Sequence, residues 1–554
     1  MDLKQRVAEA LALQRSGQHA KAAEAYRAVI EIDPRHRMAH NNLGQTMLDL
    51  GAFGEAEAHF RAAIDIQNTD PGVHVNLGVA LLRQRRHAEA IAACEDALKL
   101  DPGYMGALNN LAGLLKDVGR FDEAIAMYRK ALGAKDSALA HSNYLLSLHY
   151  GHYLSAADLF AEHRAWAARN EPPPPSGGYA HTNTREPERR LKVGYLSPDF
   201  HFHPVAYFIG AVLAAHDRQR FEIFCLSTSK RADNMTKILK GIGHAWRDLG
   251  FLDNKALAAE IRREGIDILV DLSGHTAENR MGAVALKPAP VQMTYLGYPD
   301  TTGLSTVDYR ITDAWADPPG ESDRLASERL VRIPGGFLAY RAPADAPDVM
   351  APPVLAAGSI TFGSFNNLSK YSNESLRLWA RVLMAVPGSR FLLKSKVLDD
   401  PATRELMAAR FAEQGIPRER LEIVGGSRTV TDVLKAYGRL DIALDPTPYN
   451  GTTTTCEALW MGVPVVTLAG DRHSARVGNS ILNAVGLGSL AARDPEQYVK
   501  IAAALAAKPA ELAKLRADLR PRLSRSPLLD ARRMARELEK VYRAAWQRWC
   551  AATP

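Results

Sequence analysis

Hydrophobic and polar positions follow two different patterns along this chain of 554 residues. Over residues 1–136, small and large apolar residues recur every 34 positions. Small residues let paired helices approach closely, while larger ones fill the space between them. The pattern therefore predicts stacked helix pairs with a concave face. The recurring positions are Gly17, Gly51, Arg85 and Gly119; Ala22, Ala56, Ala90 and Ala124; Tyr26, Phe60, Cys94 and Tyr128; and Gly44, Gly78 and Ala112.

The period and pattern of residues 1–136 resemble those of tetratricopeptide repeats, whose helix pairs stack into a superhelix. A degenerate fifth unit and a linker follow over residues 137–178. His141–Tyr150 copies the first helix of a repeat, and Asp158–Ala167 reads as another helix. The run Glu171–Gly178 is rich in proline and glycine, which end regular structure there.

From Leu191 onward, short apolar strands alternate with helices, which predicts parallel α/β sheets. We predict a first lobe over residues 179–345, a linker over 346–358 and a second lobe over 359–554, with a terminal helix from about 526 to 549. The ligands of two such lobes bind where the strand carboxyl ends face a shared cleft. The predicted strands begin near residues 191, 221, 266 and 291 in the first lobe, and 360, 390, 421, 441 and 463 in the second.

Composition narrows the classes of protein that fit. The length predicts about three domains or more, and no run approaches the ~20 apolar residues of a membrane span. The N-terminus has no signal-peptide pattern, and the four cysteines form no C-x-x-C pair, so we expect a cytoplasmic protein. The net charge of +7 has no basic block behind it, and nucleic-acid binding is not indicated.

The run Tyr449–Leu468 carries the clearest candidate chemistry. Gly451 supplies a turn, and four threonines (452–455) stand where a helix should begin. We expect a helix over 456–461 that Gly462 ends, followed by a strand. An open helix N-terminus binds anions, phosphate above all, and the Glu457 carboxylate can accept hydrogen bonds from ribose hydroxyls. The alternative is a well-capped structural helix.

Two further clusters follow predicted strands. Lys370 comes after Asn366 and Asn367, and an ammonium there can balance the charge on a departing diphosphate; the alternative is an ordinary loop lysine. Asp199 and His203 follow the first strand of the first lobe. A histidine there can act as a general base, can chelate a metal together with His201, or can be structural. Polar or glycine-containing loops follow two more strands, at Gly274–Thr276 with Arg280 and at Gly297–Pro299.

Three segments together resemble the O-GlcNAc transferase and SPINDLY family: residues 274–304, 362–370 and 449–470. Members of this family join tetratricopeptide repeats to a two-lobed GT-B glycosyltransferase with two Rossmann-like α/β lobes. They transfer sugar from a nucleotide donor to Ser or Thr of proteins. The resemblance covers nearly the whole chain and implies the same architecture and reaction class here.

The resemblance also implies residue roles. His203 matches the active-site histidine, a base or acceptor-orienting group, with Asp199 before it. Lys370 is similar to the lysine that contacts the donor diphosphate, and Glu457 stands where an acidic residue holds the ribose. The remaining donor-binding matches are Thr453 and Thr454 at the phosphate helix, Thr452 in place of a histidine beside them, Asn367, Gly297, Pro299 and Arg280.

The resemblance to the two branches of the family leads to different expectations for the donor sugar. Val205, Ser369 and Thr452 depart from O-GlcNAc transferases, and the run GTTTTCE is closer to SPINDLY, whose plant members resemble GDP-fucose users. We expect an inverting, metal-independent transfer of GlcNAc from UDP-GlcNAc to protein Ser/Thr, with no cofactor and with acceptors along the inner face of the repeats. The alternatives are a GDP-fucose-dependent O-fucosyltransferase and a repeat scaffold with inactive lobes.

Overall fold

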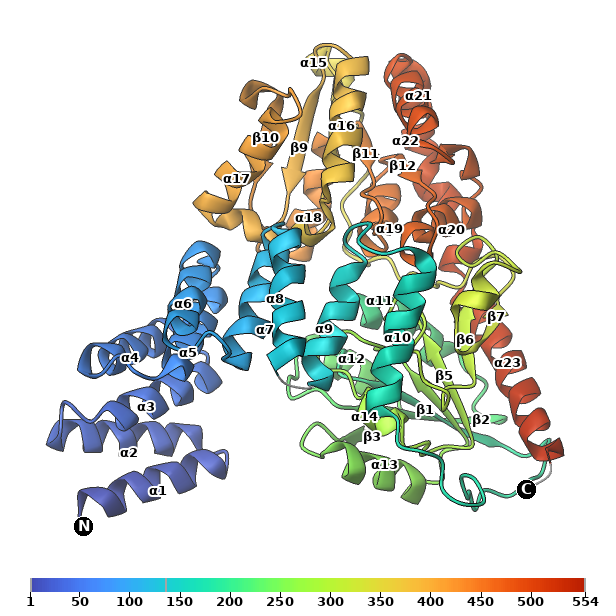
Figure 1. Ribbon diagram of the computed structural model, residues 1–554. Helices are drawn as coiled ribbons and strands as arrows, with labels where there is room; N and C mark the ends of the chain where they lie inside the picture. Colours follow the sequence, from blue (N-terminus) through green and yellow to red (C-terminus); the bar gives the residue numbers. More distant parts are fainter. Residues whose placement is uncertain (1, 135–136, 553–554) are drawn as a thin grey trace.

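The computed structural model describes residues 2–134 and 137–552. Its N-terminal part is a row of antiparallel helix pairs that extends from the side of the molecule (Figure 1). These helices are α1 (Leu3–Arg15), α2 (His19–Ile32), α3 (Arg37–Leu50), α4 (Phe53–Ile66), α5 (Pro71–Arg83), α6 (His87–Leu100), α7 (Met105–Asp117), α8 (Phe121–Ala134), α9 (Ala138–Leu148) and α10 (Ala156–Asn170). The predicted repeat boundary at 136/137 falls partly outside the described residues.

The recurring small residues serve two different purposes. A Cβ atom on Gly44 would lie 2.7 Å from the Phe60 ring, so close approach of the helices requires glycine there, as predicted. Gly17 and Gly51, by contrast, have open space around them and φ values of 76° and 79°. They end the first helix of each unit in the left-handed conformation that glycine favours, and Arg85 adopts the same conformation with φ 63°.

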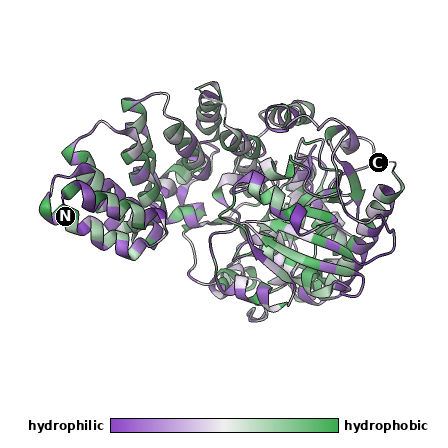
Figure 2. Cartoon of the chain, turned by 90° about the horizontal axis from the view of Figure 1, so that it is seen from below, coloured by the Kyte–Doolittle hydropathy of each residue, from purple (hydrophilic) through white to green (hydrophobic). Residues whose placement is uncertain are grey.

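The first lobe is a seven-stranded parallel sheet in the order β3-β2-β1-β4-β5-β6-β7. Its strands carry mostly hydrophobic residues (Figure 2), since helices cover both faces. Its elements are β1 (Leu191–Ser197), α11 (Pro204–Ala215), β2 (Phe221–Ser227), α12 (Asn234–Gly241), β3 (Ala245–Asp248), α13 (Asn254–Arg263), β4 (Ile268–Asp271), α14 (Met281–Val284), β5 (Val291–Tyr295), β6 (Tyr309–Thr312) and β7 (Arg329–Arg332).

The second lobe is a six-stranded parallel sheet in the order β10-β9-β8-β11-β12-β13. The two tandem parallel sheets confirm the predicted pair of Rossmann-like lobes after a repeat region. The elements are α15 (Val354–Ala357), β8 (Thr361–Ser364), α16 (Asn373–Ala385), β9 (Arg390–Lys394), α17 (Pro401–Ala412), β10 (Leu421–Val424), α18 (Val430–Ala436), β11 (Ile442–Leu444), α19 (Thr453–Trp460), β12 (Val465–Leu468), α20 (Val477–Ala484), β13 (Ala491–Ala492), α21 (Pro495–Ala506), α22 (Pro509–Ser524) and α23 (Ala531–Ala551).

The terminal helix α23 does not stay with the lobe to which the sequence assigned it. It packs against α11 of the first lobe, where the Tyr542 and Tyr195 hydroxyls lie 2.8 Å apart and Glu539 contacts His216 at 2.9 Å. This crossing ties the two lobes together at the far side from the repeats.

The repeats contact both lobes. Helices α9 and α10 lie against the first lobe (Figure 1), and Arg410 of α17 in the second lobe lies over the ring of Phe121 in α8. The chain runs from α10 to β1 through residues 171–190, which contain the predicted linker. All four cysteines are free. Among the described residues, no helix combines the length and apolar character that a membrane span needs.

Candidate active site

A cavity of about 500 Å³ lies between the two lobes and is closed on one side by α9. Most of the predicted site residues line it, although they come from separate loops of both lobes. They are Asp199, His203, Gly297, Pro299, Asn367, Lys370, Thr452, Thr453 and Thr454. A larger hollow of about 790 Å³, between α10 and the helices α13 and α14, contains none of the predicted residues.

On the first-lobe side, His203 forms the N-cap of α11. Its Nδ1 accepts a hydrogen bond from the Val205 backbone N–H at 3.3 Å, and Pro204 occupies the first helical position. Asp199 Oδ2 lies 3.5 Å from the same Nδ1. Because Nδ1 is an acceptor in this geometry, neutral His203 carries its proton on Nε2. This arrangement favours the acceptor-orienting role over the base role.

Both groups of this wall favour their uncharged forms. Burial raises the pKa of Asp199 to about 7, helped by the negative charges of Glu278 and Asp271. Burial also lowers the pKa of His203 to about 4, and the neighbouring His201 and Arg231 act in the same direction. A neutral imidazole and a carboxyl group that is only partly ionised near neutral pH suit uncharged hydroxyls better than phosphate.

The loop after β5 brings backbone to the cavity. A Cβ atom on Gly297 would lie 1.8 Å from the Leu272 carbonyl oxygen, so only glycine allows this approach. Leu296 beside it has φ 69°, a conformation that side chains rarely adopt. Strain of this kind concentrates at ligand-binding loops.

On the second-lobe side, Lys370 is held in place by backbone. Its Nζ donates to the Asn450 carbonyl at 2.7 Å and lies 4.1 Å from the centre of the Tyr449 ring. Burial lowers the pKa of Lys370, and the nearby carboxylate of Asp445 opposes this. A buried ammonium with one backbone partner keeps two N–H groups for an anionic ligand.

The glycine–threonine turn is fixed by two contacts. The Gly451 N–H donates to Asp445 Oδ1 at 2.7 Å, and the Thr454 hydroxyl donates to Asn366 Oδ1 at 2.8 Å. Helix α19 begins at Thr453, three residues earlier than predicted, and the Thr452 side chain makes no capping hydrogen bond. The first turn of α19 therefore keeps backbone N–H groups available at the cavity.

Two predicted residues do not line the cavity. Glu457 lies behind the threonines, where its carboxylate accepts from the Tyr437 hydroxyl at 3.2 Å, and burial raises its pKa to about 7. Arg280 turns away altogether: its guanidinium donates to the Asn254 side chain and the Leu252 carbonyl, because α13 packs beside its loop. The structure thus gives Arg280 a role in packing the loop and does not place it at the cavity.

Comparisons with known proteins agree with this architecture. Residues 175–340 and 353–538 match the family model described as glycosyl transferase family 41. Residues 7–71 and 81–142 match tetratricopeptide repeat models.

The chain belongs to glycosyl transferase family 41.

Among curated relatives, this family 41 chain is 42% identical over 420 residues to the probable UDP-N-acetylglucosamine–peptide N-acetylglucosaminyltransferase SPINDLY of Solanum lycopersicum, covering 75% of this chain and 45% of that protein. It is 31% identical over 374 residues to the SEC protein of Arabidopsis thaliana, covering 65% and 38%. The chain spans less than half the length of these relatives. A solved mutant of the Thermobaculum terrenum O-GlcNAc transferase is 35% identical, with a TM-score of 0.80 over 99% of this chain and 98% of that one.

Other polar residues of the family 41 region dock the repeats. His275 is fully buried, with one ring nitrogen 3.0 Å from the Ser142 hydroxyl of α9 and the other 2.8 Å from the Thr302 carbonyl. The Tyr298 hydroxyl lies 2.7 Å from His163 and 3.2 Å from His149. Both loops follow strands, as the sequence indicated: the His275 and Tyr298 side chains contact the repeats, whereas the neighbouring Thr276, Gly297 and Pro299 line the cavity.

One group among the described residues has metal-ligand geometry: His149, His163 and Asp300 bring their ligand atoms within 4.8 Å of one another. It lies at the junction with the repeats, outside the residues that line the cavity. The hydroxyl of Tyr298 sits between the two imidazoles and hydrogen-bonds both. That hydrogen bonding accounts for the cluster, and His201 and His203 do not belong to it.

Several cavity residues were missed by the sequence reading. Leu146 and Tyr150 extend the wall from the degenerate repeat, and Tyr150 stacks on Tyr449 with ring centres 5.1 Å apart. His473 lines the cavity from the second lobe, shortly after β12. The rule that ligands bind beyond strand carboxyl ends, applied to β12 as it was to the other strands, would have found His473.

Proposed function

We propose that this chain is an inverting, metal-independent protein O-glycosyltransferase that moves GlcNAc from UDP-GlcNAc to Ser or Thr hydroxyls. The observation that carries the proposal is one cavity that the Lys370 ammonium and the α19 N-terminus line on one side. His203 and Asp199, whose charged forms burial disfavours, line the other side. One side suits a diphosphate and the other suits hydroxyl groups. A scaffold without turnover has no use for this division.

In the proposed reaction, the acceptor oxygen attacks the anomeric carbon as the bond to the diphosphate breaks. The electron pair leaves with the nucleoside diphosphate. The Lys370 ammonium and the backbone N–H groups of the first turn of α19, at Thr453 and Thr454, stabilise the negative charge of this leaving group. Glu457 lies one turn further along the helix, outside the lining of the cavity, and is proposed to meet a ribose that extends beyond the threonines. His203 orients the entering hydroxyl through its Nε2–H. Since these groups supply the charge stabilisation, EDTA should leave the rate unchanged, and lost activity in EDTA would argue against the mechanism.

The donor is the finer part of the proposal. The named SPINDLY and SEC relatives are described as UDP-N-acetylglucosamine transferases, which supports UDP-GlcNAc over GDP-fucose. Calorimetry of the full chain with UDP, GDP, UDP-GlcNAc and GDP-fucose tests it. We expect UDP to bind more tightly than GDP. Tighter binding of GDP would replace the assignment with a GDP-fucose-dependent fucosyltransferase, and the absence of turnover with either sugar would favour the inactive scaffold.

Acceptor proteins are proposed to reach the cavity along the inner face of the repeats. Leu146 and Tyr150 of the last repeat line the cavity itself, so a peptide leaving the superhelix enters the site directly. Deleting residues 1–136 should reduce transfer to proteins more than donor hydrolysis. Because this deletion also removes the Phe121–Arg410 contact, a shorter deletion of residues 1–68 serves as a second test. Unimpaired glycosylation of full-length proteins by both variants would show that the repeats do not guide the substrate.

A further inference from the structure

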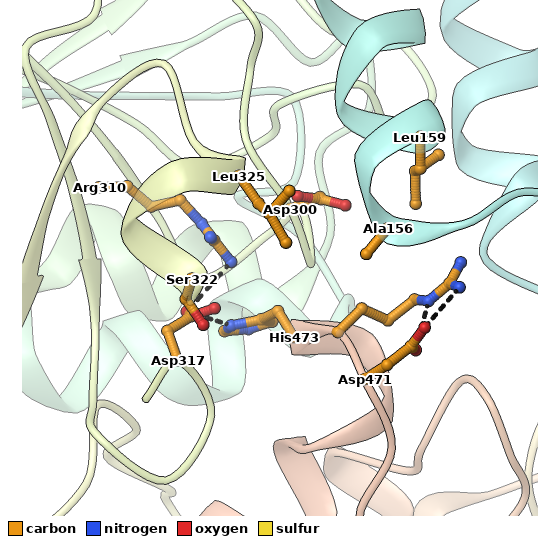
Figure 3. Close-up of a pocket in the computed structure, with 10 residues that line it drawn as sticks. Ala156, Leu159, Asp300, Arg310, Asp317, Ser322, Leu325, Asp471 and His473 are labelled. Atoms are coloured by element: carbon orange, nitrogen blue, oxygen red, sulfur yellow. Dashed lines mark hydrogen bonds and ion pairs between the residues drawn. The ribbon is translucent and has the colours of Figure 1, made fainter. Parts of the chain in front are cut away.

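A second histidine of the cavity, His473, is paired with a carboxylate from the opposite lobe. His473 stands between β12 and α20, and its Nδ1 lies 2.7 Å from Oδ2 of Asp317, which follows β6 of the first lobe (Figure 3). His473 is 7% exposed and lines the same cavity as His203. The pair joins two residues that are 156 positions apart in the sequence.

Asp317 is built to stay ionised. Burial alone would raise its pKa, but the charge of Arg310 and the hydrogen bonds from His473 and Thr312 outweigh burial and hold the pKa well below its ordinary value. The Arg310 guanidinium lies 3.4 Å from the same oxygen (Figure 3). The Thr312 hydroxyl also donates to it. An acceptor-only carboxylate requires a proton on Nδ1 of His473.

That requirement fixes the tautomer of His473. With the proton on Nδ1, neutral His473 has its lone pair on Nε2, and no hydrogen bond to Nε2 is found among the described residues. His203 is the reverse case, because its Nδ1 accepts from Val205 and its Nε2 carries the proton. The cavity therefore holds one imidazole arranged to donate a proton and one arranged to accept a proton.

We propose that His473 is the general base of the transfer and that Asp317 positions it; this rests on the proposed function. His473 Nε2 takes the proton of the acceptor hydroxyl as the oxygen–carbon bond forms and the bond to the diphosphate breaks. Asp317 then stabilises the imidazolium, and Arg310 holds Asp317 in place. A buried carboxylate behind Nδ1 is the arrangement that orients catalytic histidines in hydrolases. The charged and titratable groups facing His473 are Asp317, Arg310, Asp300, Arg472, Asp471 and His149.

The tautomer can be measured without turnover. Nitrogen NMR of the full chain, labelled selectively at histidine and assigned with single variants, should show neutral His473 protonated on Nδ1 and neutral His203 protonated on Nε2. Protonation of His473 on Nε2 would overturn the proposal whatever the enzyme's donor or acceptor.

The His473→Asn variant separates a base from a contact between lobes. The asparagine amide can still donate to Asp317 in place of Nδ1, but no atom replaces Nε2. Transfer should fall by about 10²–10⁴-fold, the limb of the pH–rate profile that reports the base should disappear, and nucleoside diphosphate affinity should be unchanged. In Asp317→Asn the side-chain amide disfavours the Nδ1–H tautomer of His473. The transfer rate should therefore fall, and the same limb of the pH–rate profile should change.

A matched control variant distinguishes the loss of a general base from the loss of a histidine–carboxylate contact. His152 also pairs with a carboxylate across the repeat–lobe junction, Nδ1 to Glu374 at 2.6 Å, but does not line the cavity. His152→Asn should transfer within about twofold of the wild type, because general-base effects need contact with the reacting group. Normal transfer by His473→Asn beside an active wild type would overturn the base role alone. No transfer by the wild type with either donor would overturn the proposed function and the base role together.

Discussion

The two walls of the cavity differ in how their polar groups are held. On the second-lobe wall, Lys370, Gly451 and Thr454 are tied to a backbone carbonyl, a buried carboxylate and a side-chain amide at 2.7–2.8 Å. On the first-lobe wall, Asp199 and His203 have looser contacts, at 3.3–3.5 Å, and pKa values shifted toward their neutral forms.

This difference indicates a division of labour. Preorganised donors stabilise charge without reorganising during the reaction, which is what a diphosphate leaving group requires. Neutral groups desolvate cheaply, so they suit sugar and acceptor hydroxyls that enter and leave. The His473–Asp317 pair spans the two walls and is aligned only when the lobes are in this relative position.

The sharpest test of the comparison is Lys370→Ala. If the second-lobe wall carries the charge of the leaving group, the rate should fall by at least ~10²-fold, as when one oxyanion donor is removed. Initial rates with radiolabelled donor measure this. Lys396→Ala, which removes an exposed ammonium of the same lobe, is the control and should be near normal. Near-normal turnover in Lys370→Ala would contradict the assignment of leaving-group stabilisation to the second-lobe wall.

The first-lobe wall should respond to pH through stability. The pKa of Asp199 is about 7 when folded and ordinarily 3.8, so wild-type stability is lost through this group as pH rises from about 4 to about 7. Asp199→Asn avoids that loss. We expect the variant's free energy of unfolding to exceed that of the wild type by on the order of 2 kcal/mol at pH 8, below the full value of the shift because the site is partly solvated.

Chemical denaturation at pH 4 and pH 8 measures this effect. The gain of Asp199→Asn should shrink to roughly 0.5 kcal/mol at pH 4, where the carboxyl group is protonated in the folded state and about half ionised in the unfolded state. An equal gain at both pH values would mean that the substitution acts by packing and not by titration.

The smallest expected effect is that of Thr454→Val. It removes the hydroxyl that donates to Asn366. The bound conformation of the turn before α19 is then less stable by about 0.5–1.5 kcal/mol, the free energy of one hydrogen bond. Nucleoside diphosphate affinity should fall by about threefold to tenfold in calorimetry. Thr455→Val is the matched control, because no partner for the Thr455 hydroxyl is found among the described residues. Equal losses in both variants would show that the Thr454 contact has no special role.

Local patterns were sufficient for much of the molecule. The 34-residue period located the helix pairs, and the alternation of strands and helices located both sheets, because these signals depend on neighbouring residues in the chain. The strand-end rule placed Lys370, His203 and Gly297 at one cavity, since parallel strands present all their carboxyl ends at one edge. The sequence alone thus determined the fold class and most of the candidate site.

The tertiary structure decided how these parts face one another. The same strand-end rule predicted Arg280 at the site, but packing of α13 turns its guanidinium away. His275 and Tyr298 follow strands too, yet they dock the repeats. No local pattern reports such outcomes, because they depend on which elements pack against each loop.

The pairing of His473 with Asp317 shows this limit most clearly. Each residue stands after a strand of a different lobe, and their contact depends on the relative rotation of the lobes, which α23 and the repeats set. The shifted pKa values of Asp199 and His203 likewise arise from burial between the lobes. Sequence periodicity encodes short-range order, whereas the burial and distance that decide protonation exist only once the lobes have met.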